Sequence, residues 1–129
     1  MRRVSEKEIQ AVLQLDGQSR FERLIKVVAD SETAWGLWRD GWALFEDDAG
    51  MMVFPLWPAK EFAEACRLGD WANYEATPIP VDDLFSKLLP SLRQKSVLAG
   101  VFPTPSGQGV TVDGDVLERA LRDELEKYG

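Results

Sequence analysis

The sequence has 129 residues, a net charge of −7, a hydrophobic fraction of 45% and a charged fraction of 29%. This length suits one domain with one core, and this composition excludes a disordered chain. No segment approaches the roughly 20 apolar residues of a membrane-spanning helix, and no apolar segment follows the basic N-terminus. We therefore expect a cytoplasmic domain spanning residues 1–129 that does not associate with membranes.

Two helices are predicted at the start of the chain. Ser5 and Glu8 have the spacing of a capping box, and Ser19 and Glu22 repeat it. Asp16-Gly17 separates the two segments and predicts the end of the first helix. Apolar residues follow each box at helical spacing, which gives each helix one buried face: Ile9, Val12 and Leu13, then Phe21, Leu24, Ile25 and Val28.

Residues 33–58 predict a three-stranded antiparallel meander. Asp40-Gly41 favours a two-residue hairpin turn, and Asp47–Gly50 predicts a second turn, with aromatic and branched residues between them. Pro55 predicts that the third strand ends there or lies at a sheet edge. A third helix is predicted from Pro58 to Gly69.

The second half of the chain predicts a helix, two strands and a closing helix. We expect residues 71–80 to be irregular or briefly extended. A helix follows from Asp82, and Pro90 should kink or end it. The apolar run 96–102 predicts a central strand, residues 110–112 a short last strand, and the final helix begins near Asp113 or Asp115. The fold class is α+β: a mainly antiparallel sheet of about five short strands with about five helices.

Few residues suggest catalysis. The chain has no histidine, which excludes Ser-His-Asp and Cys-His mechanisms and histidine-based zinc sites. Its one cysteine, Cys66, lies on the inner face of a predicted helix, so we expect it to be buried. The carboxylate clusters Asp47-Asp48, Asp82-Asp83 and Asp113–Asp115 suit turns and helix starts. We expect no catalytic residue, no metal, no cofactor and no enzymatic activity.

The middle of the chain is acidic and rich in tryptophan. Residues 30–83 hold three Lys/Arg and twelve Asp/Glu, a net charge of −9, which disfavours nucleic-acid binding. Most of the five tryptophans should lie in the core, while Trp38 or Trp42 is a candidate for an exposed binding anchor. We predict a non-enzymatic interaction domain that meets a basic protein partner through this region, using Asp40, Trp42, Glu46, Asp47 and Asp48.

Two alternatives remain open. Residues 84–112 carry three Lys/Arg and no Asp/Glu, a net charge of +3, which suits an anionic small molecule bound near the Pro103–Gly109 loop by Arg93, Lys95 and Gln108. Such a site would belong to a ligand binder or an unusual enzyme. The other alternative is self-association through an exposed edge strand at Met51–Phe54, so we expect a monomer or a weak homo-oligomer.

One set of motifs resembles a known family. They are Trp35-x-x-Trp38, Gly41-Trp42, Phe54-Pro55-Leu56-Trp57-Pro58, Trp71 with Tyr74, Leu89-Pro90 and Gly100-Val101-Phe102-Pro103. Together they are similar to domain of unknown function 2750, from the second helix to the end of the chain. The resemblance implies a small bacterial protein of the cytosol, and it brings no established activity, cofactor or catalytic residue.

Overall fold

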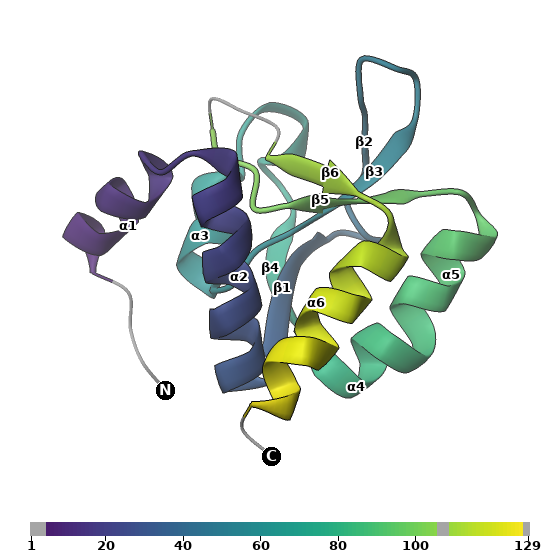
Figure 1. Ribbon diagram of the computed structural model, residues 1–129. Coiled ribbons are helices and arrows are strands. Elements are labelled where there is room, and N and C mark those ends of the chain that lie inside the picture. The colour runs from purple at the N-terminus through teal and green to yellow at the C-terminus, as the bar shows by residue number, and fades with distance from the viewer. Residues whose placement is uncertain (1–4, 106–108, 128–129) are drawn as a thin grey trace.

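The computed structural model describes residues 5–105 and 109–127 (Figure 1). It confirms the α+β class, with helices packed on two sheets. The helices are α1 (Glu6–Leu13), α2 (Gly17–Ser31), α3 (Lys60–Ala65), α4 (Val81–Asp83), α5 (Leu89–Gln94) and α6 (Gly114–Glu126). The strands are β1 (Thr33–Trp38), β2 (Phe45–Glu46), β3 (Met52–Leu56), β4 (Glu75–Pro80), β5 (Leu98–Val101) and β6 (Val110–Val112).

The first two helices begin at side-chain caps. Ser5 Oγ accepts a hydrogen bond from the Glu8 N–H at 3.1 Å, as predicted. The prediction for the second helix was wrong by three residues, because Asp16 rather than Ser19 is its cap. Asp16 Oδ1 accepts from the Ser19 N–H at 2.7 Å, and this bond lowers the pKa of the Asp16 carboxyl. A carboxylate at the positive end of a helix dipole is the stronger acceptor of the two.

The predicted meander is wrong in its first pairing. β1 pairs along its whole length with β4 in a two-stranded antiparallel sheet, so part of the stretch 71–80, which we expected to be irregular or briefly extended, is a strand. The other sheet has the order β2-β3-β5-β6, in which only β3 and β5 run parallel. Of the hairpin predicted at Asp40-Gly41, only a single antiparallel bridge between Trp38 and Trp42 forms. Its loop has three residues instead of the predicted two.

The edge of β3 that carries β2 also contacts β1. Phe45 of β2 pairs with Val53, while Trp35 of β1 and Trp57 exchange two backbone hydrogen bonds of 2.9 and 2.8 Å. Pro55 lies between these two pairings on the same edge, since alternate residues of a strand direct their backbone groups to one side. The side of Pro55 on which another residue would carry its N–H therefore faces the part of this edge that β2 does not cover.

Two sequence predictions are corrected by this arrangement. Pro55 does not end the strand, which runs on to Leu56, although it lies where β2 no longer covers the edge of β3. Met51–Phe54 is not the exposed edge strand that self-association was expected to use, because β3 lies between β2 and β5. β5 is central, as predicted from its apolar run, and β6 and α6 follow at the predicted positions.

Helices enclose a core between themselves and the sheets. α2 and α6 pack side by side in front of β1 and β4 (Figure 1). A π-helical turn, Leu84–Leu88, joins α4 to α5, and the Leu89 N–H donates to the Leu84 carbonyl. This wider turn comes just before Pro90, which cannot donate to Ser86, and it lets the helix continue. The largest fully buried side chains include Trp57, Phe54, Phe102, Leu24, Leu37, Leu117 and Leu121.

Candidate interaction surface

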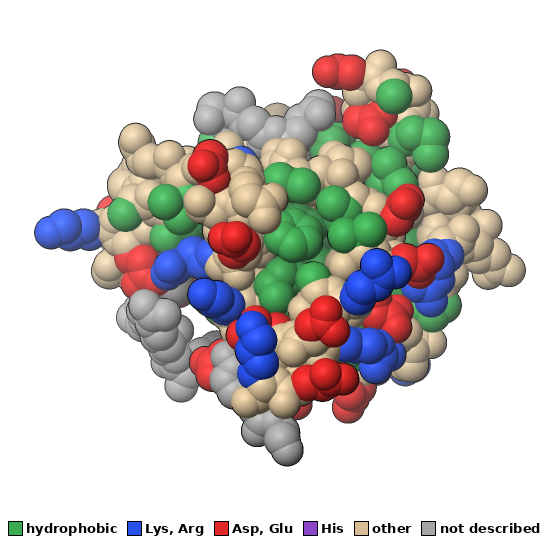
Figure 2. All heavy atoms as spheres, viewed as in Figure 1, with side chains coloured by type: hydrophobic (Ala, Val, Ile, Leu, Met, Phe, Trp, Pro, Cys, Tyr) green, Lys and Arg blue, Asp and Glu red, His purple; other side chains and the backbone are tan. Residues whose placement is uncertain are grey.

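The β2–β3 hairpin projects from the body of the molecule (Figure 1). On this hairpin and just before it, Leu44, Met51 and Met52 are exposed by 39%, 38% and 39% of their surface. Acidic and hydrophobic side chains gather together on this projection (Figure 2). We give the name hairpin surface to the exposed and predicted contact residues of this hairpin and of the segment before it: Asp40, Trp42, Leu44, Glu46, Asp47, Asp48, Met51 and Met52.

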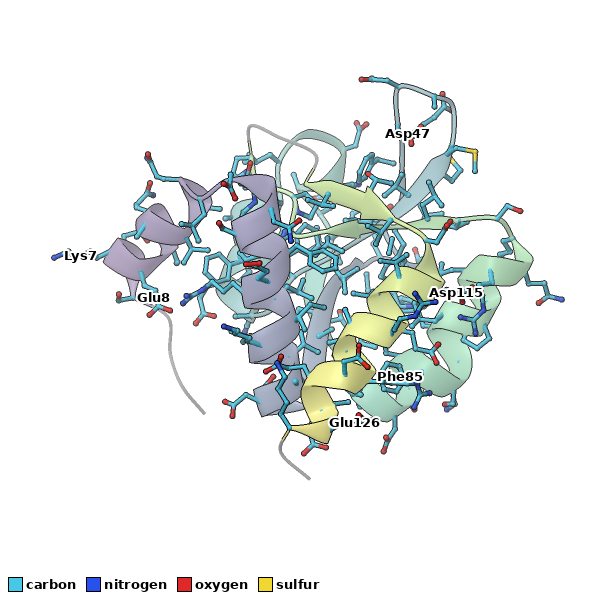
Figure 3. The ribbon with its side chains drawn as sticks, in the orientation of Figure 1. Lys7, Glu8, Asp47, Phe85, Asp115 and Glu126 are labelled. Carbon is cyan, nitrogen blue, oxygen red and sulfur yellow. The ribbon has the colours of Figure 1, made fainter. Side chains whose placement is uncertain are left out.

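The four carboxylates of the hairpin surface differ in what they contact. Asp47, at the tip (Figure 3), closes the turn, because its Oδ1 accepts from the N–H groups of Ala49 and Met51, both at 2.9 Å. Asp40, Glu46 and Asp48 are exposed, and their side chains make no hydrogen bond or ion pair with any described residue. Three negative charges therefore remain without an ion pair in the part of the chain that the structure describes.

Two tryptophans connect the hairpin surface to the core. The half-buried ring of Trp42 meets the buried ring of Phe54 edge to face, with centroids 5.6 Å apart. It also lies over Gly36, where its Cζ3 is 3.0 Å from the place of a Cβ. The Trp38 ring packs against Trp42 at 5.0 Å and 80°, and 44% of Trp38 is exposed. Of the two predicted anchors, Trp38 is therefore the exposed one.

Cys66 is buried, as predicted, and belongs to a structural contact. Its Sγ lies 3.5 Å from the Pro103 carbonyl oxygen, which also accepts a hydrogen bond from Trp57 Nε1 at 2.9 Å. Burial raises the pKa of the Cys66 thiol to about 11, and the contact with the Trp57 side chain lowers it slightly. The thiol stays protonated near neutral pH, so it is a poor nucleophile.

Of the predicted anion contacts, Arg93 already pairs with carboxylates of α6. Arg93 Nη1 is paired with Asp115 Oδ1 at 2.8 Å and with Glu118 Oε1 at 3.3 Å. Lys95 is exposed just after α5, and Gln108 lies outside the described residues. The guanidinium of Arg93 is therefore already engaged by carboxylates, and an anion would have to compete with both.

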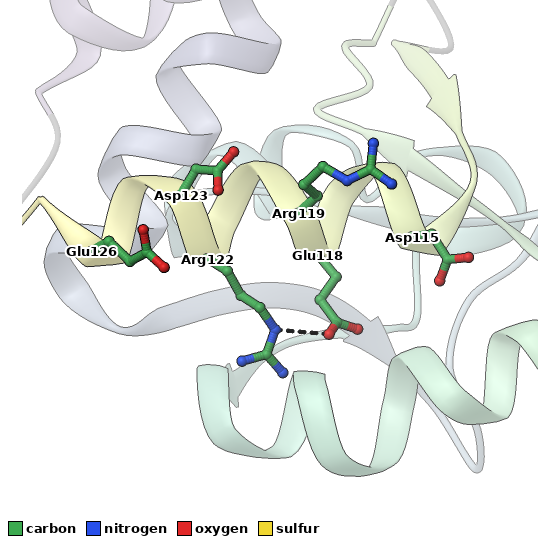
Figure 4. Close-up of a pocket in the computed structure, with 6 residues that line it drawn as sticks. All are labelled: Asp115, Glu118, Arg119, Arg122, Asp123 and Glu126. Carbon is green, nitrogen blue, oxygen red and sulfur yellow. Dashed lines mark hydrogen bonds and ion pairs between the residues drawn. The ribbon is translucent and has the colours of Figure 1, made fainter.

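An open hollow runs along the outer side of α6 (Figure 4). Arg122 Nε donates to Glu118 Oε2 at 2.8 Å, and this bond is the largest of the effects that lower the pKa of the Glu118 carboxyl. The hollow has charged walls of both signs, and its ion pairs connect α6 to α5. Its lining residues are Asp115, Glu118, Arg119, Arg122, Asp123 and Glu126.

Neither a metal centre nor a membrane span emerges from the described residues. Across residues 5–105 and 109–127, no three Cys, Asp or Glu side chains gather in a way that could hold a metal ion. Over the same ranges, every helix is too short or too polar to cross a bilayer.

A family model described as protein of unknown function (DUF2750) matches residues 21–121. The chain belongs to this family. The match includes every motif that carried the resemblance in the sequence, from Trp35 to Pro103. No curated protein and no solved structure matches this DUF2750 protein.

In this DUF2750 protein, Met51–Phe54 was predicted only as an exposed strand edge, and the exposed side chains of Leu44, Met51 and Met52 were not singled out. The pair Met51-Met52 directly follows a predicted turn, and two consecutive residues of a strand cannot both face the core, so an exposed methionine could have been expected. Leu44 is exposed as well, next to the half-buried Phe45 of β2. The position of Glu75 opposite Trp38 had no local signal, because it depends on the pairing of β1 with β4.

Proposed function

We propose that this DUF2750 protein is a non-enzymatic interaction domain of the bacterial cytoplasm that binds a basic protein partner through the hairpin surface. One observation carries the proposal: a projecting hairpin exposes Leu44, Met51 and Met52 among carboxylates that form no ion pair with a described residue. Burial of the apolar side chains would supply affinity, and the carboxylates would steer a basic partner to the surface.

The charge of the chain supports a protein partner over a nucleic acid. The acidic stretch 30–83, with its net charge of −9, includes the whole hairpin surface. A phosphate backbone is repelled by such a surface, whereas a surface rich in Lys and Arg is attracted. The anionic small-molecule alternative has less support, because Arg93 is held by two carboxylates.

Glu46 and Asp48 are the residues with which to test the proposal. Both are exposed and unpaired among the described residues, whereas replacing Asp47 would also break the turn. The double variant E46K/D48K reverses two charges at the hairpin. A matched control, D123K/E126K, reverses two exposed carboxylates on α6.

The experiment is capture of binding proteins from the organism's own lysate at low and moderate salt, read by mass spectrometry. We expect the parent protein and the α6 control to retain the same basic protein at low salt and to lose it as salt rises. The hairpin variant should fail to retain it at either salt. Equal capture by all three proteins, or capture of no basic protein by the parent, would overturn the proposal.

A further inference from the structure

Trp38 has an unusual environment for a tryptophan at the end of a strand. The register of β1 and β4 places Trp38 directly opposite Glu75, so the two side chains lie on one face of the two-stranded sheet. Farther along the same face Ala34 and Ile79 are buried, while Trp38 and Glu75 are both exposed. This face therefore runs from the core to solvent and ends in an aromatic ring beside a carboxylate.

The ring of Trp38 is held in place before any partner binds. Trp42 packs against it at 5.0 Å, and Trp42 is itself fixed between Gly36 and Phe54. An aromatic side chain that is already ordered loses little conformational entropy on binding. The exposed part of Trp38 is therefore available as a rigid platform.

No described cation neutralises the carboxylates around Trp38. Glu75 makes no side-chain hydrogen bond or ion pair with a described residue, and neither does Asp40, two residues after Trp38. Arg39 follows Trp38 directly, in the turn after β1, and its side chain makes no ion pair with a described carboxylate. An indole ring next to two negative charges attracts a cation through the ring face and through the carboxylates together.

A filled arrangement of the same kind exists elsewhere in this molecule. The Arg122 guanidinium carbon lies 4.2 Å from the centroid of the Phe85 ring, while Arg122 Nε donates to Glu118 at 2.8 Å. Figure 3 places Phe85 next to α6, and Figure 4 shows the Arg122–Glu118 bond. One arginine there satisfies an aromatic ring and a carboxylate at once. Trp38 and Glu75 present the same two parts without an arginine from the described chain.

We propose that Trp38 and Glu75 form a seat for an arginine side chain of the basic partner, an inference that rests on the proposed function and specifies its recognition. Arginine suits the seat better than lysine, because its flat guanidinium can stack on an indole ring while its N–H groups reach a carboxylate. Asp40 adds negative charge at the rim of the seat.

The test is a titration of the isotope-labelled protein with hexa-arginine and hexa-lysine peptides, followed by amide and indole NMR signals. We expect hexa-arginine to move the Trp38 indole N–H signal, to leave that of the buried Trp57 in place, and to bind about two- to fivefold tighter than hexa-lysine. The variant W38L should weaken hexa-arginine binding by a similar factor. E75Q should weaken it too, whereas E126Q, which removes one charge from α6, should not.

The outcomes separate this inference from the proposed function. If the peptides move the amide signals of Glu46 and Asp48 but leave the Trp38 indole unmoved, the arginine seat is wrong and the hairpin surface stands. If neither set moves, both proposals fail. Equal affinity for the two peptides, or unchanged binding by both W38L and E75Q with native-like spectra, would also overturn the seat.

Discussion

At the scale of single residues, two glycines allow bulky side chains to approach the sheets. A Cβ on Gly36 would lie 3.0 Å from Trp42, and a Cβ on Gly100 would lie 2.7 Å from Val53 Cγ1. Neither position has a positive φ, so glycine is required there by the close packing and not by the backbone conformation. The stiff, branched Val53 side chain cannot turn away easily, which makes Gly100 the more sensitive of the two.

Gly100→Ala should lower the free energy of unfolding by about 1–3 kcal/mol, because the added methyl group overpacks the contact with Val53. Gly114→Ala is the matched control, since its Cβ would meet Leu89 at an ordinary 3.5 Å in the first turn of α6. We expect that control to be neutral or to stabilise by up to about 1 kcal/mol. Urea unfolding of the three proteins measures both values, and a neutral Gly100→Ala would contradict the packing account.

The buried thiol of Cys66 makes a prediction about alkaline pH. Its pKa rises from 9.0 to about 11 on folding, so the folded state keeps a proton that the unfolded state loses. The stabilisation is fully present below pH 9 and is lost as pH rises towards 11. Relative to Cys66→Ala, the parent protein should therefore lose about 2 kcal/mol of stability between these limits. Urea unfolding at pH 8 and pH 10.5 tests this, and a constant difference between the two proteins would refute it.

At the scale of elements, the β2–β3 hairpin depends on its turn. β2 pairs with β3 through two residues, and Asp47 holds the connection through bonds to Ala49 and Met51. The turn itself was predictable, because Asp47–Gly50 has its chemistry in four consecutive residues. The exposure of Leu44 was not, since it depends on where β3 and β1 lie along the same edge.

Asp47→Ala should loosen the hairpin without unfolding the core. Loss of the two hydrogen bonds leaves the turn less ordered, so amide hydrogen exchange should rise across residues 45–53 and stay unchanged in β5. Asp48→Ala is the control, because its carboxylate makes no hydrogen bond or ion pair with a described residue. Faster exchange in β5 as well, or equal effects of the two variants, would show that Asp47 is not specific to the turn.

Trp57 joins the ends of the parallel strands β3 and β5. Its indole donates to the Pro103 carbonyl just after β5, in a place where Trp57 is fully buried. Trp57→Phe should cost about 2–3 kcal/mol, because it opens a cavity and removes the main donor to a buried carbonyl. Trp71→Phe, at a half-buried ring, should cost less. Thermal unfolding of both variants measures the difference, and equal costs would argue against the hydrogen bond.

At the scale of the whole molecule, the class of fold was predictable and the strand order was not. Amphipathic periodicity and turn residues are local signals, and they placed β5, β6 and α6 correctly. The pairing of β1 with β4 joins residues about forty positions apart, so no local signal predicts it. In addition, Pro78 and Pro80 make the sequence of β4 resemble that of a loop. β4 tolerates these prolines because it pairs with β1 only. On the side that faces away from β1, a backbone N–H would have no strand to bond, so its absence costs no sheet hydrogen bond.

The interaction residues, too, could be predicted only in part from the sequence. Asp40, Glu46 and Asp48 were predicted from an acidic, tryptophan-rich stretch, and they are exposed, but their role in binding stays a prediction. The role of Asp47 in the turn and the exposure of Trp38 required side-chain geometry. The basic partner itself stays a prediction.

The measurement that tests the central claim most directly is the association rate of the basic partner recovered by capture. At low salt, E46K/D48K should associate at least about tenfold more slowly than the parent, and this difference should shrink as salt rises, because both charges steer the encounter. D123K/E126K should associate at nearly the parental rate. Equal association rates for the parent and the hairpin variant would show that the partner binds elsewhere on the molecule.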